Sequence, residues 1–307
     1  MSYEDFKKKV YSYLIKYKKE YLGIVEKGVS SHGVEHDCLF PKPYCDEKLP
    51  SMLYADIRPV VKDIQSSSFA YKPHLAASSH VASSQTACIN LFVPILESNK
   101  ADQILIESGD APKGFAHIDR EQLRKGYCFE YWESSLKGSK GLLVDHSPHA
   151  GTDADVAIAY RDKDNKLCLW LIEHKLTEQE FSTCGGYRSK GISESEKINC
   201  TTCSMIDLMN DHKKCYYHKH CGYYYWNIMD AQSTFFNGNY DGTGCPFRGG
   251  MNQLWRNQMM ALELEHCAAF ADVFFSVVTH PENTFLDNTM NEFRELTKNS
   301  HKFFDFK

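Results

Sequence analysis

Two apolar runs separated by a short charged segment most strongly constrain how this chain folds. Residues 156–160 alternate between large apolar side chains and alanine, and residues 167–172 are almost entirely apolar and aromatic. Both patterns are typical of buried β-strands. The segment between them, RDKDNK (161–166), is polar and turn-forming. The sequence therefore predicts an antiparallel hairpin.

Charged residues stand at the ends of both predicted strands. Asp155 directly precedes the first run, and Glu173 and Lys175 close the second. Hairpin pairing brings Asp155 beside Glu173. Because residues two apart share a face of a strand, Glu173 and Lys175 point to one side and His174 to the other. Two such acids suit an open site for Mg²⁺ or Mn²⁺, and the lysine suits a water-activating role in phosphodiester hydrolysis. The same spacing also fits ordinary polar strand ends.

The segment resembles the PD-(D/E)XK nuclease superfamily. Asp155 matches the first acid and Glu173-His174-Lys175 matches the (D/E)XK triplet, with Ala154 in place of the nominal proline. Asp153 is the competing match for the first acid. Asp155 is preferred because it directly abuts the apolar strand.

Four further blocks resemble a restriction-endonuclease-like branch of that superfamily: HVASSQTACINLF (80–92), CFEYW (128–132), IEHKLTEQEF (172–181) and MNQLWRNQMMALELE (251–265). The resemblance implies an α/β fold with a mixed α+β sheet and the core order α-β-β-β-α-β. The local patterns agree with this order. They predict a helix from Ser83 or Ser84 to about Leu96, a strand over 127–132, a helix over 252–267 and a last strand over 273–278.

Three other polar residues are candidates for the same site. Glu130 lies within the strand predicted over residues 127–132, where it suits a further metal ligand or a residue that holds a ligand water. The alternative is an ordinary glutamate on an edge strand. Gln253 lies on the helix after the strands, where related nucleases place a glutamine that contacts the active site or the DNA backbone. Gln258 and Gln85 are weaker candidates for the same role. The alternative for all three glutamines is an ordinary position on a helix surface.

Six of the twelve cysteines crowd into residues 184–245. This region has little hydrophobic periodicity, so we do not expect it to bury a core of its own. A structural metal site could stabilise it instead. Cys88, Cys128, Cys168 and Cys267 fall within apolar elements and are expected to be buried.

Related nucleases that carry a 4Fe-4S cluster on widely separated cysteines imply a structural cluster here, with the ligands Cys184, Cys203, Cys215 and Cys245. Cys200 or Cys221 can replace one of them. Zinc is the alternative ion, with help from His212, His218 or His220, and unliganded thiols are the remaining possibility.

Four parts of the chain follow from these patterns. Residues 1–79 form an N-terminal helical and loop layer, with a helix over 5–27, and residues 80–181 form the first part of the nuclease core. Residues 182–248 form the cysteine-rich insertion. Residues 249–307 form the second part of the core, with a helix over 287–298.

The net charge of −5 and the pI of about 6.3 provide no global basic field, so DNA binding must rest on local basic residues. Tyrosines 223–225 and Trp226 offer faces for base stacking, although core packing is the favoured role for them. The candidates for phosphate contact are Arg188, Lys190, Lys213, Lys214, Arg248 and Arg256.

The charged start MSYEDFKKKV lacks the apolar centre of a secretion signal, and no stretch is apolar enough for a membrane span, so a soluble cytoplasmic protein is expected. HGVEH (32–36) matches the H-x-x-E-H pattern of zinc peptidases. However, Gly33 and the nearby prolines favour a loop over the helix that such a site needs.

The leading hypothesis is a Mg²⁺- or Mn²⁺-dependent deoxyribonuclease, with Asp155 and Glu173 binding the metal and Lys175 assisting the attacking water. The alternative is a non-catalytic DNA-binding or interaction protein that keeps the nuclease fold, with the cysteine-rich insertion binding zinc.

Overall fold

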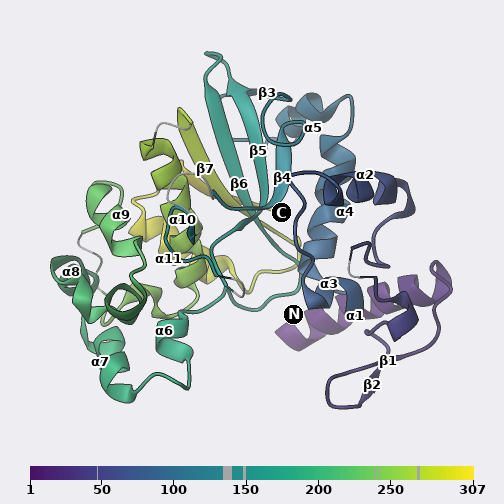
Figure 1. The fold of residues 1–307 in the computed structure, drawn as a ribbon, viewed down its shortest axis with the longest axis horizontal. Helices are drawn as coiled ribbons and strands as arrows, with labels where there is room; N and C mark the ends of the chain where they lie inside the picture. The colour runs from purple at the N-terminus through teal and green to yellow at the C-terminus, as the bar shows by residue number, and fades with distance from the viewer. Residues whose placement is uncertain (47, 134–139, 148–149, 239, 241, 268–269) are drawn as a thin grey trace.

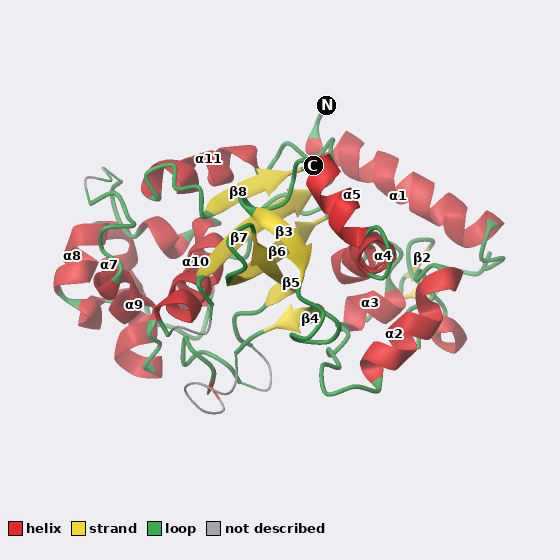
Figure 2. Ribbon diagram, turned by 90° about the horizontal axis from the view of Figure 1, so that it is seen from above, coloured by secondary structure: helices red, strands yellow, loops and turns green. Residues whose placement is uncertain are grey.

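The computed structural model describes residues 1–46, 48–133, 140–147, 150–238, 240, 242–267 and 270–307. Within these residues a six-stranded mixed sheet lies between two groups of helices (Figures 1 and 2). The strands are β3 (Phe115–Ile118), β4 (Tyr127–Tyr131), β5 (Ala154–Asp162), β6 (Leu167–Lys175), β7 (Asp272–Thr279) and β8 (Phe303–Phe306).

The β5–β6 hairpin forms the centre of the sheet. Its register pairs Val156 with Ile172, and Asn165 in its loop adopts a φ of 62°, which asparagine tolerates better than most residues. β3 and β4 both pair antiparallel with the other side of β5. β7 and then β8 extend the sheet beyond β6 in parallel. The predicted hairpin and the predicted mixed α/β fold are therefore confirmed.

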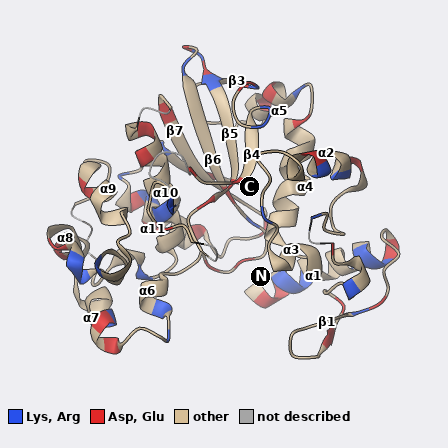
Figure 3. Ribbon diagram, in the orientation of Figure 1, with Lys and Arg blue, Asp and Glu red and all other residues tan. Residues whose placement is uncertain are grey.

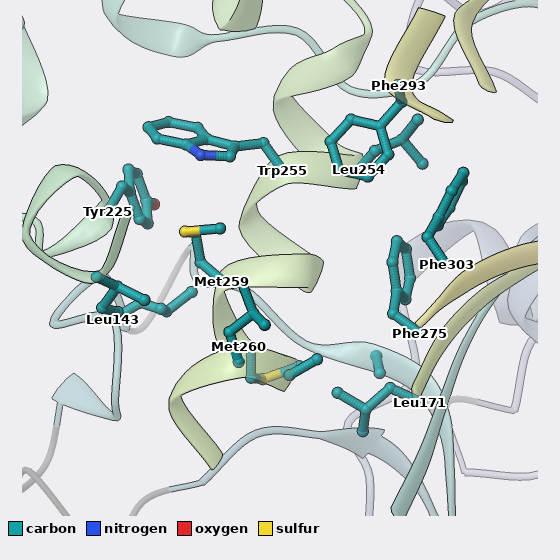
Figure 4. Packing of buried hydrophobic residues seen from close by; sticks show 14 of the residues in the cluster. Leu143, Leu171, Tyr225, Leu254, Trp255, Met259, Met260, Phe275, Phe293 and Phe303 are labelled. Carbon is teal, nitrogen blue, oxygen red and sulfur yellow. The ribbon is translucent and has the colours of Figure 1, made fainter. Parts of the chain in front are cut away.

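Alternate side chains of the strands enter two separate cores. On one face, residues such as Ile158 and Trp170 pack with α4 (Ser84–Leu96). On the other face, residues such as Leu171 and Phe275 pack with α10 (Met251–His266), as Figure 4 shows. Burial of each such side chain stabilises the fold by about 1.5–3 kcal/mol. The two faces thus hold the central strands in a fixed position.

The predicted core elements form close to their expected bounds. Ser83 caps α4 by accepting a hydrogen bond from the backbone N–H of Thr86 (3.2 Å), so Ser83 rather than Ser84 is the cap. α10 and β7 begin and end within one residue of the prediction, and α11 (Asp287–Leu296) ends two residues early. One burial prediction is wrong: Cys267 follows the end of α10 and is exposed.

The N-terminal layer contains α1 (Tyr3–Glu20), α2 (Arg58–Gln65), α3 (Leu75–Ser79) and a two-stranded sheet, β1 (Gly28–Val29) with β2 (Glu35–His36). The prediction that the first helix reaches residue 27 is wrong. Gly23, at a φ of 68°, lies in the turn after α1. Lys18 is fully buried, and its Nζ donates to the carbonyls of residues 26, 37 and 39. These bonds tie the helix end to the following loop.

The HGVEH motif lies in the exposed turn and strand of this small β1–β2 sheet. Its histidines therefore do not share a helix face, and the expectation of a loop is confirmed. Among the residues that the structure describes, no helix combines the length and apolar character needed to cross a bilayer.

The cysteine-rich region contains more regular structure than its sequence suggests. Its described residues form four short α-helices beside α10, 3-10 turns at His212–Lys214 and Pro246–Arg248, and a π-helical turn at Tyr217–Cys221 (Figure 1). The helices are α6 (Gly185–Arg188), α7 (Glu194–Thr202), α8 (Met205–Asn210) and α9 (Tyr225–Ala231). α5 (Ala101–Ser108) covers the other side of the sheet, near β3.

Candidate active site

The sheet brings Asp155, Glu173 and Lys175 together at one end of the β5–β6 hairpin. The strand register places Asp155 one position beyond the Val156–Ile172 pair, beside Glu173. Asp155 Oδ2 accepts a hydrogen bond from the backbone N–H of His174 at 2.6 Å. Lys175 Nζ lies 2.8 Å from Glu173 Oε1, and both side chains are buried.

His174 points to the opposite face of the sheet. Its Nδ1 lies 3.1 Å from the hydroxyl of Ser84, which also lies 3.0 Å from the His174 carbonyl. Burial lowers the pKa of His174 to about 4, so the imidazole is neutral at physiological pH. The middle residue of the Glu-His-Lys triplet therefore fastens β6 to the start of α4.

Two amides of α10 hold the Glu173 carboxylate. Gln253 Nε2 donates to Glu173 Oε1 at 2.7 Å, and Asn257 Nδ2 donates to Oε2 at 2.9 Å. Gln253 also accepts from the backbone N–H of Ser182 at 3.0 Å. Asn257 was not singled out from the sequence, although its spacing of four residues from Gln253 puts it on the same helix face. Gln258 is fully buried and does not contact Glu173 among the described hydrogen bonds.

Glu130 occupies an unusual backbone position beside these residues. Its neighbours Phe129 and Tyr131 pair with Val156 and Ala154, so Glu130 lies opposite Asp155. Its φ is 50°, a left-handed conformation that is uncommon for glutamate and that clusters at functional sites.

Gln85 and His74 contact Glu130. Gln85 Nε2 donates to Glu130 Oε1 at 2.7 Å. His74 Nε2 lies 3.6 Å from Glu130 Oε2, and this carboxylate raises the pKa of His74. Gln85 therefore reaches the site through Glu130 and not through Glu173.

Negative charge accumulates where these strands meet. Burial and the carboxylates of Glu173 and Glu130 hold the pKa of Asp155 well above its usual value. Burial, with the same two carboxylates, raises the pKa of Asp153 to about 7. Burial lowers the pKa of Lys175, but its acidic neighbours outweigh burial, so the net shift is upward and the ammonium stays charged.

This donor set fits a hard divalent cation. Mg²⁺ in proteins usually takes one or two carboxylates and completes its shell with water and substrate phosphate oxygens. Asp155 and Glu173 supply two carboxylates. A cation bound to them would relieve the repulsion between carboxylates that raises the pKa values of Asp153 and Asp155. In the part of the chain that the structure describes, no group of three or more His, Cys, Asp or Glu residues is arranged to hold a metal ion.

The sequence model of one protein family, described as restriction endonuclease associating with ARP, matches residues 16–303. The chain belongs to this family. No curated protein and no solved structure matches it. Family membership indicates a nuclease-like function with DNA as the substrate.

In this restriction-endonuclease family member, the partly buried side chain of Arg256 makes hydrogen bonds within the protein. Its Nη1 donates to the Gly151 carbonyl (3.3 Å) and to the Thr152 hydroxyl (3.2 Å), and the Asp145 carboxylate accepts from both Thr152 and Tyr225. The predicted contact of Arg256 with phosphate stays a prediction. This buried network supports the loop that leads into Asp153.

The aromatic candidates for base stacking divide into two groups. Tyr225 and Trp226 are 2% and 1% exposed and pack in the core, as the favoured interpretation expected. Tyr224 is exposed and Tyr223 is half-buried, so base stacking by these two stays a prediction. Arg248 donates to the backbone carbonyls of Cys200 and Thr243. Figure 3 shows basic and acidic residues interspersed on the outer helices.

A second group of reactive side chains lies in the cysteine-rich region. Cys184, Cys200, Cys215 and Cys245 line one cavity, and these four cysteines are not in disulfide bonds. Burial raises the pKa of the Cys184 thiol to about 12 and that of Cys200 to about 11, with Cys215 adding to both shifts.

Three of the four predicted cluster ligands therefore line one cavity, together with Cys200, which the sequence analysis gave as a possible replacement. The sulfur of Cys203 lies 3.8 Å from Asn199 Oδ1 and does not line the cavity. The histidines suggested for zinc do not line the cavity either: His212, His218 and His220.

Proposed function

We propose that this protein is a Mg²⁺- or Mn²⁺-dependent deoxyribonuclease that hydrolyses DNA phosphodiester bonds by a PD-(D/E)XK mechanism. The observation that carries the proposal is the convergence of Asp155, Glu173 and Lys175 at one end of a central hairpin. Membership of a restriction-endonuclease family supports it independently.

The order of the elements also supports a restriction-endonuclease-like core. α4, β4, β5, β6, α10 and β7 follow one another in the order α-β-β-β-α-β. α5 and β3 lie between α4 and β4, and the cysteine-rich helices lie between β6 and α10. Both additions leave the β5–β6 hairpin and its carboxylates intact.

In the proposed mechanism Asp155 and Glu173 hold the divalent cation. The bound cation would polarise the phosphate and lower the pKa of a coordinated water. Lys175 orients the attacking water and offsets the negative charge that develops on the phosphate. Its upward-shifted pKa keeps it protonated for this role.

The surrounding residues position these groups. Gln253 and Asn257 each donate to one oxygen of Glu173, so they fix the orientation of its carboxylate. Glu130, opposite Asp155, supplies a further ligand or holds a ligand water. Gln85 donates to the Glu130 carboxylate and fixes its orientation. Preorganised donors of this kind lose little freedom at the moment of reaction.

The test is incubation of the purified protein with linear, circular and single-stranded DNA and Mn²⁺. The variants Glu173→Gln and Lys175→Ala should not cleave. Asp164→Asn and Lys166→Ala are matched controls, because they change the same charges in the exposed loop of the same hairpin. The controls should cleave like the wild type. Equal cleavage by all five proteins would show that the site is misassigned.

The net charge of −5 and the ion pair that engages Lys175 favour a second candidate, a protein that binds DNA on this fold without cutting it. Tight binding in a gel-shift assay, with no turnover for any DNA form or divalent metal, would support it. Robust metal-dependent cleavage would remove it.

A further inference from the structure

Four cysteines from four separate segments meet at one cavity. Cys184 precedes α6, Cys200 lies in the last turns of α7, Cys215 follows the turn His212–Lys214, and Cys245 precedes the turn Pro246–Arg248. All four line the same cavity. Since the segments are up to 61 residues apart (245 − 184), tertiary structure brings the thiols together.

Backbone hydrogen bonds hold these segments in register. The N–H of Cys245 donates to the carbonyl of Cys200 at 2.9 Å, and the N–H of Cys184 donates to the carbonyl of Arg248 at 3.3 Å. Asn199 Nδ2 donates to the Lys214 carbonyl at 3.1 Å, which ties α7 to the segment before Cys215. The convergence is therefore built into the backbone and does not depend on side-chain rotamers alone.

The remaining walls of the cavity are largely apolar and aromatic. Leu208, Trp226, Phe247 and Trp255 line it and are 1–2% exposed. Phe247 and Trp255 stack with ring centroids 3.9 Å apart. Lys214, Arg248 and Asn252 also line the cavity. The four thiols are its distinctive feature, and soft thiolates are the preferred ligands of zinc and of iron–sulfur clusters.

The spacing of the four cysteines along the chain separates these two metals. Structural zinc sites usually take their thiolates in pairs that are separated by about two to four residues. Each of these four cysteines is at least 15 residues from the next along the chain. An iron–sulfur cluster takes one thiolate at each of several iron atoms, so its ligands stand further apart around a larger body.

We propose that Cys184, Cys200, Cys215 and Cys245 bind an iron–sulfur cluster that fastens the cysteine-rich segment to the first turns of α10. The four thiols release their protons to solvent when they bind. The cluster takes no part in hydrolysis.

The first turns of α10 connect this centre to the carboxylate site. Asn252 and Trp255 line the cysteine cavity. Gln253 and Asn257, on another face of the same helix, donate to Glu173. A cluster that fixes this part of α10 therefore also fixes the two amides that orient the Glu173 carboxylate.

The direct test is the metal content of the full-length protein purified without oxygen. A 4Fe-4S cluster predicts about four iron atoms and about four acid-labile sulfides per chain, with broad absorbance in the visible range. Stoichiometric zinc without iron would overturn the proposal, and so would a protein that contains no metal.

Cys200→Ser and Cys203→Ser form a matched pair for the ligand set, because both residues lie in the same segment and only Cys200 lines the cavity. Iron should fall several-fold in Cys200→Ser and stay at the wild-type level in Cys203→Ser. The reverse pattern would overturn the assignment, and the wild-type iron content decides the main point even if one variant fails to fold. Glu173→Gln should keep its iron, so failure of the nuclease proposal and failure of the cluster proposal are distinguishable.

Discussion

The carboxylate site at the end of the β5–β6 hairpin and the cysteine-lined cavity beside α10 differ in how the chain brings their side chains together. Asp155 and Glu173 are neighbours because two long strands pair, and both faces of those strands are buried. The four cysteines are neighbours because four short segments meet between helices of four to nine residues.

This difference predicts different dependence on metal. Apolar burial on both faces of the sheet holds the carboxylates in place whether or not a cation is bound. The cysteine-rich segment buries fewer residues and ends its helices within one or two turns, so a bound cluster would supply much of its local stability. Under the two proposals, the metal of the first site serves chemistry and the metal of the second site serves structure.

The largest effect expected concerns the choice between the two aspartates. Asp155→Asn should reduce DNA cleavage by at least about a hundredfold, because a metal ligand and its charge are lost. Asp153→Asn should have a smaller effect, because Asp153 only neighbours the pair. Steady-state cleavage rates in Mn²⁺ check this. A larger loss in Asp153→Asn would move the first metal ligand to Asp153 and break the hairpin-pairing argument.

A smaller loss is expected from Asn257→Ala. A hydrogen bond to a charged acceptor contributes about 1.5–3 kcal/mol, so its removal should slow cleavage by about ten- to a hundredfold through a misoriented Glu173. The control is Asn291→Ala, an exposed position on α11. Unchanged cleavage in Asn257→Ala would mean that the α10 amides do not orient the carboxylate.

Removal of the cluster should separate the two regions. After iron is extracted with a chelator, amide hydrogen exchange should speed up by about tenfold or more in residues 184–248, which corresponds to about 1.4 kcal/mol of local opening free energy. β5 and β6 should keep their protection. Equal loss of protection in both regions would contradict the idea that only the cysteine-rich segment depends on its metal for structure.

The smallest effect is the pH dependence of stability in the absence of divalent metal. The folded-state pKa values of Asp153 and Asp155 are raised, so the folded protein binds more protons than the unfolded chain above pH ~4. The melting temperature should therefore fall as pH rises from about 4 to about 7. Mn²⁺ should raise it more at pH 8 than at pH 5, since protons compete with the cation. Asp153→Asn should flatten the metal-free profile; an unchanged profile would refute this origin.

The hairpin and its charged ends were predictable because strand periodicity is local. Alternation in residues 156–160 fixes which face each side chain takes, and residues two apart then share that face. The same rule placed Glu173 and Lys175 together and His174 on the opposite side, as observed. The helix α4 and its cap at Ser83 were predictable for a similar reason.

Other features depend on long-range contacts that no local pattern reveals. The short strands β3 and β8 form because neighbouring strands already present a free edge to them. The left-handed backbone of Glu130 and the exchange of Cys200 for Cys203 depend on how distant segments pack. The division of the chain into four parts, the nuclease roles and the identities of the metals stay predictions.

The central claim is that Asp155 and Glu173 share one catalytic cation. A crystal structure of the protein with Mn²⁺, with anomalous diffraction recorded at the manganese edge, tests it most directly. A Mn²⁺ ion shared by Asp155 and Glu173 should give an anomalous peak about 2.1 Å from oxygens of both carboxylates, a coordination distance typical of a small hard cation. A fully occupied Mn²⁺ elsewhere, or saturating Mn²⁺ with no peak between these two side chains, would contradict it.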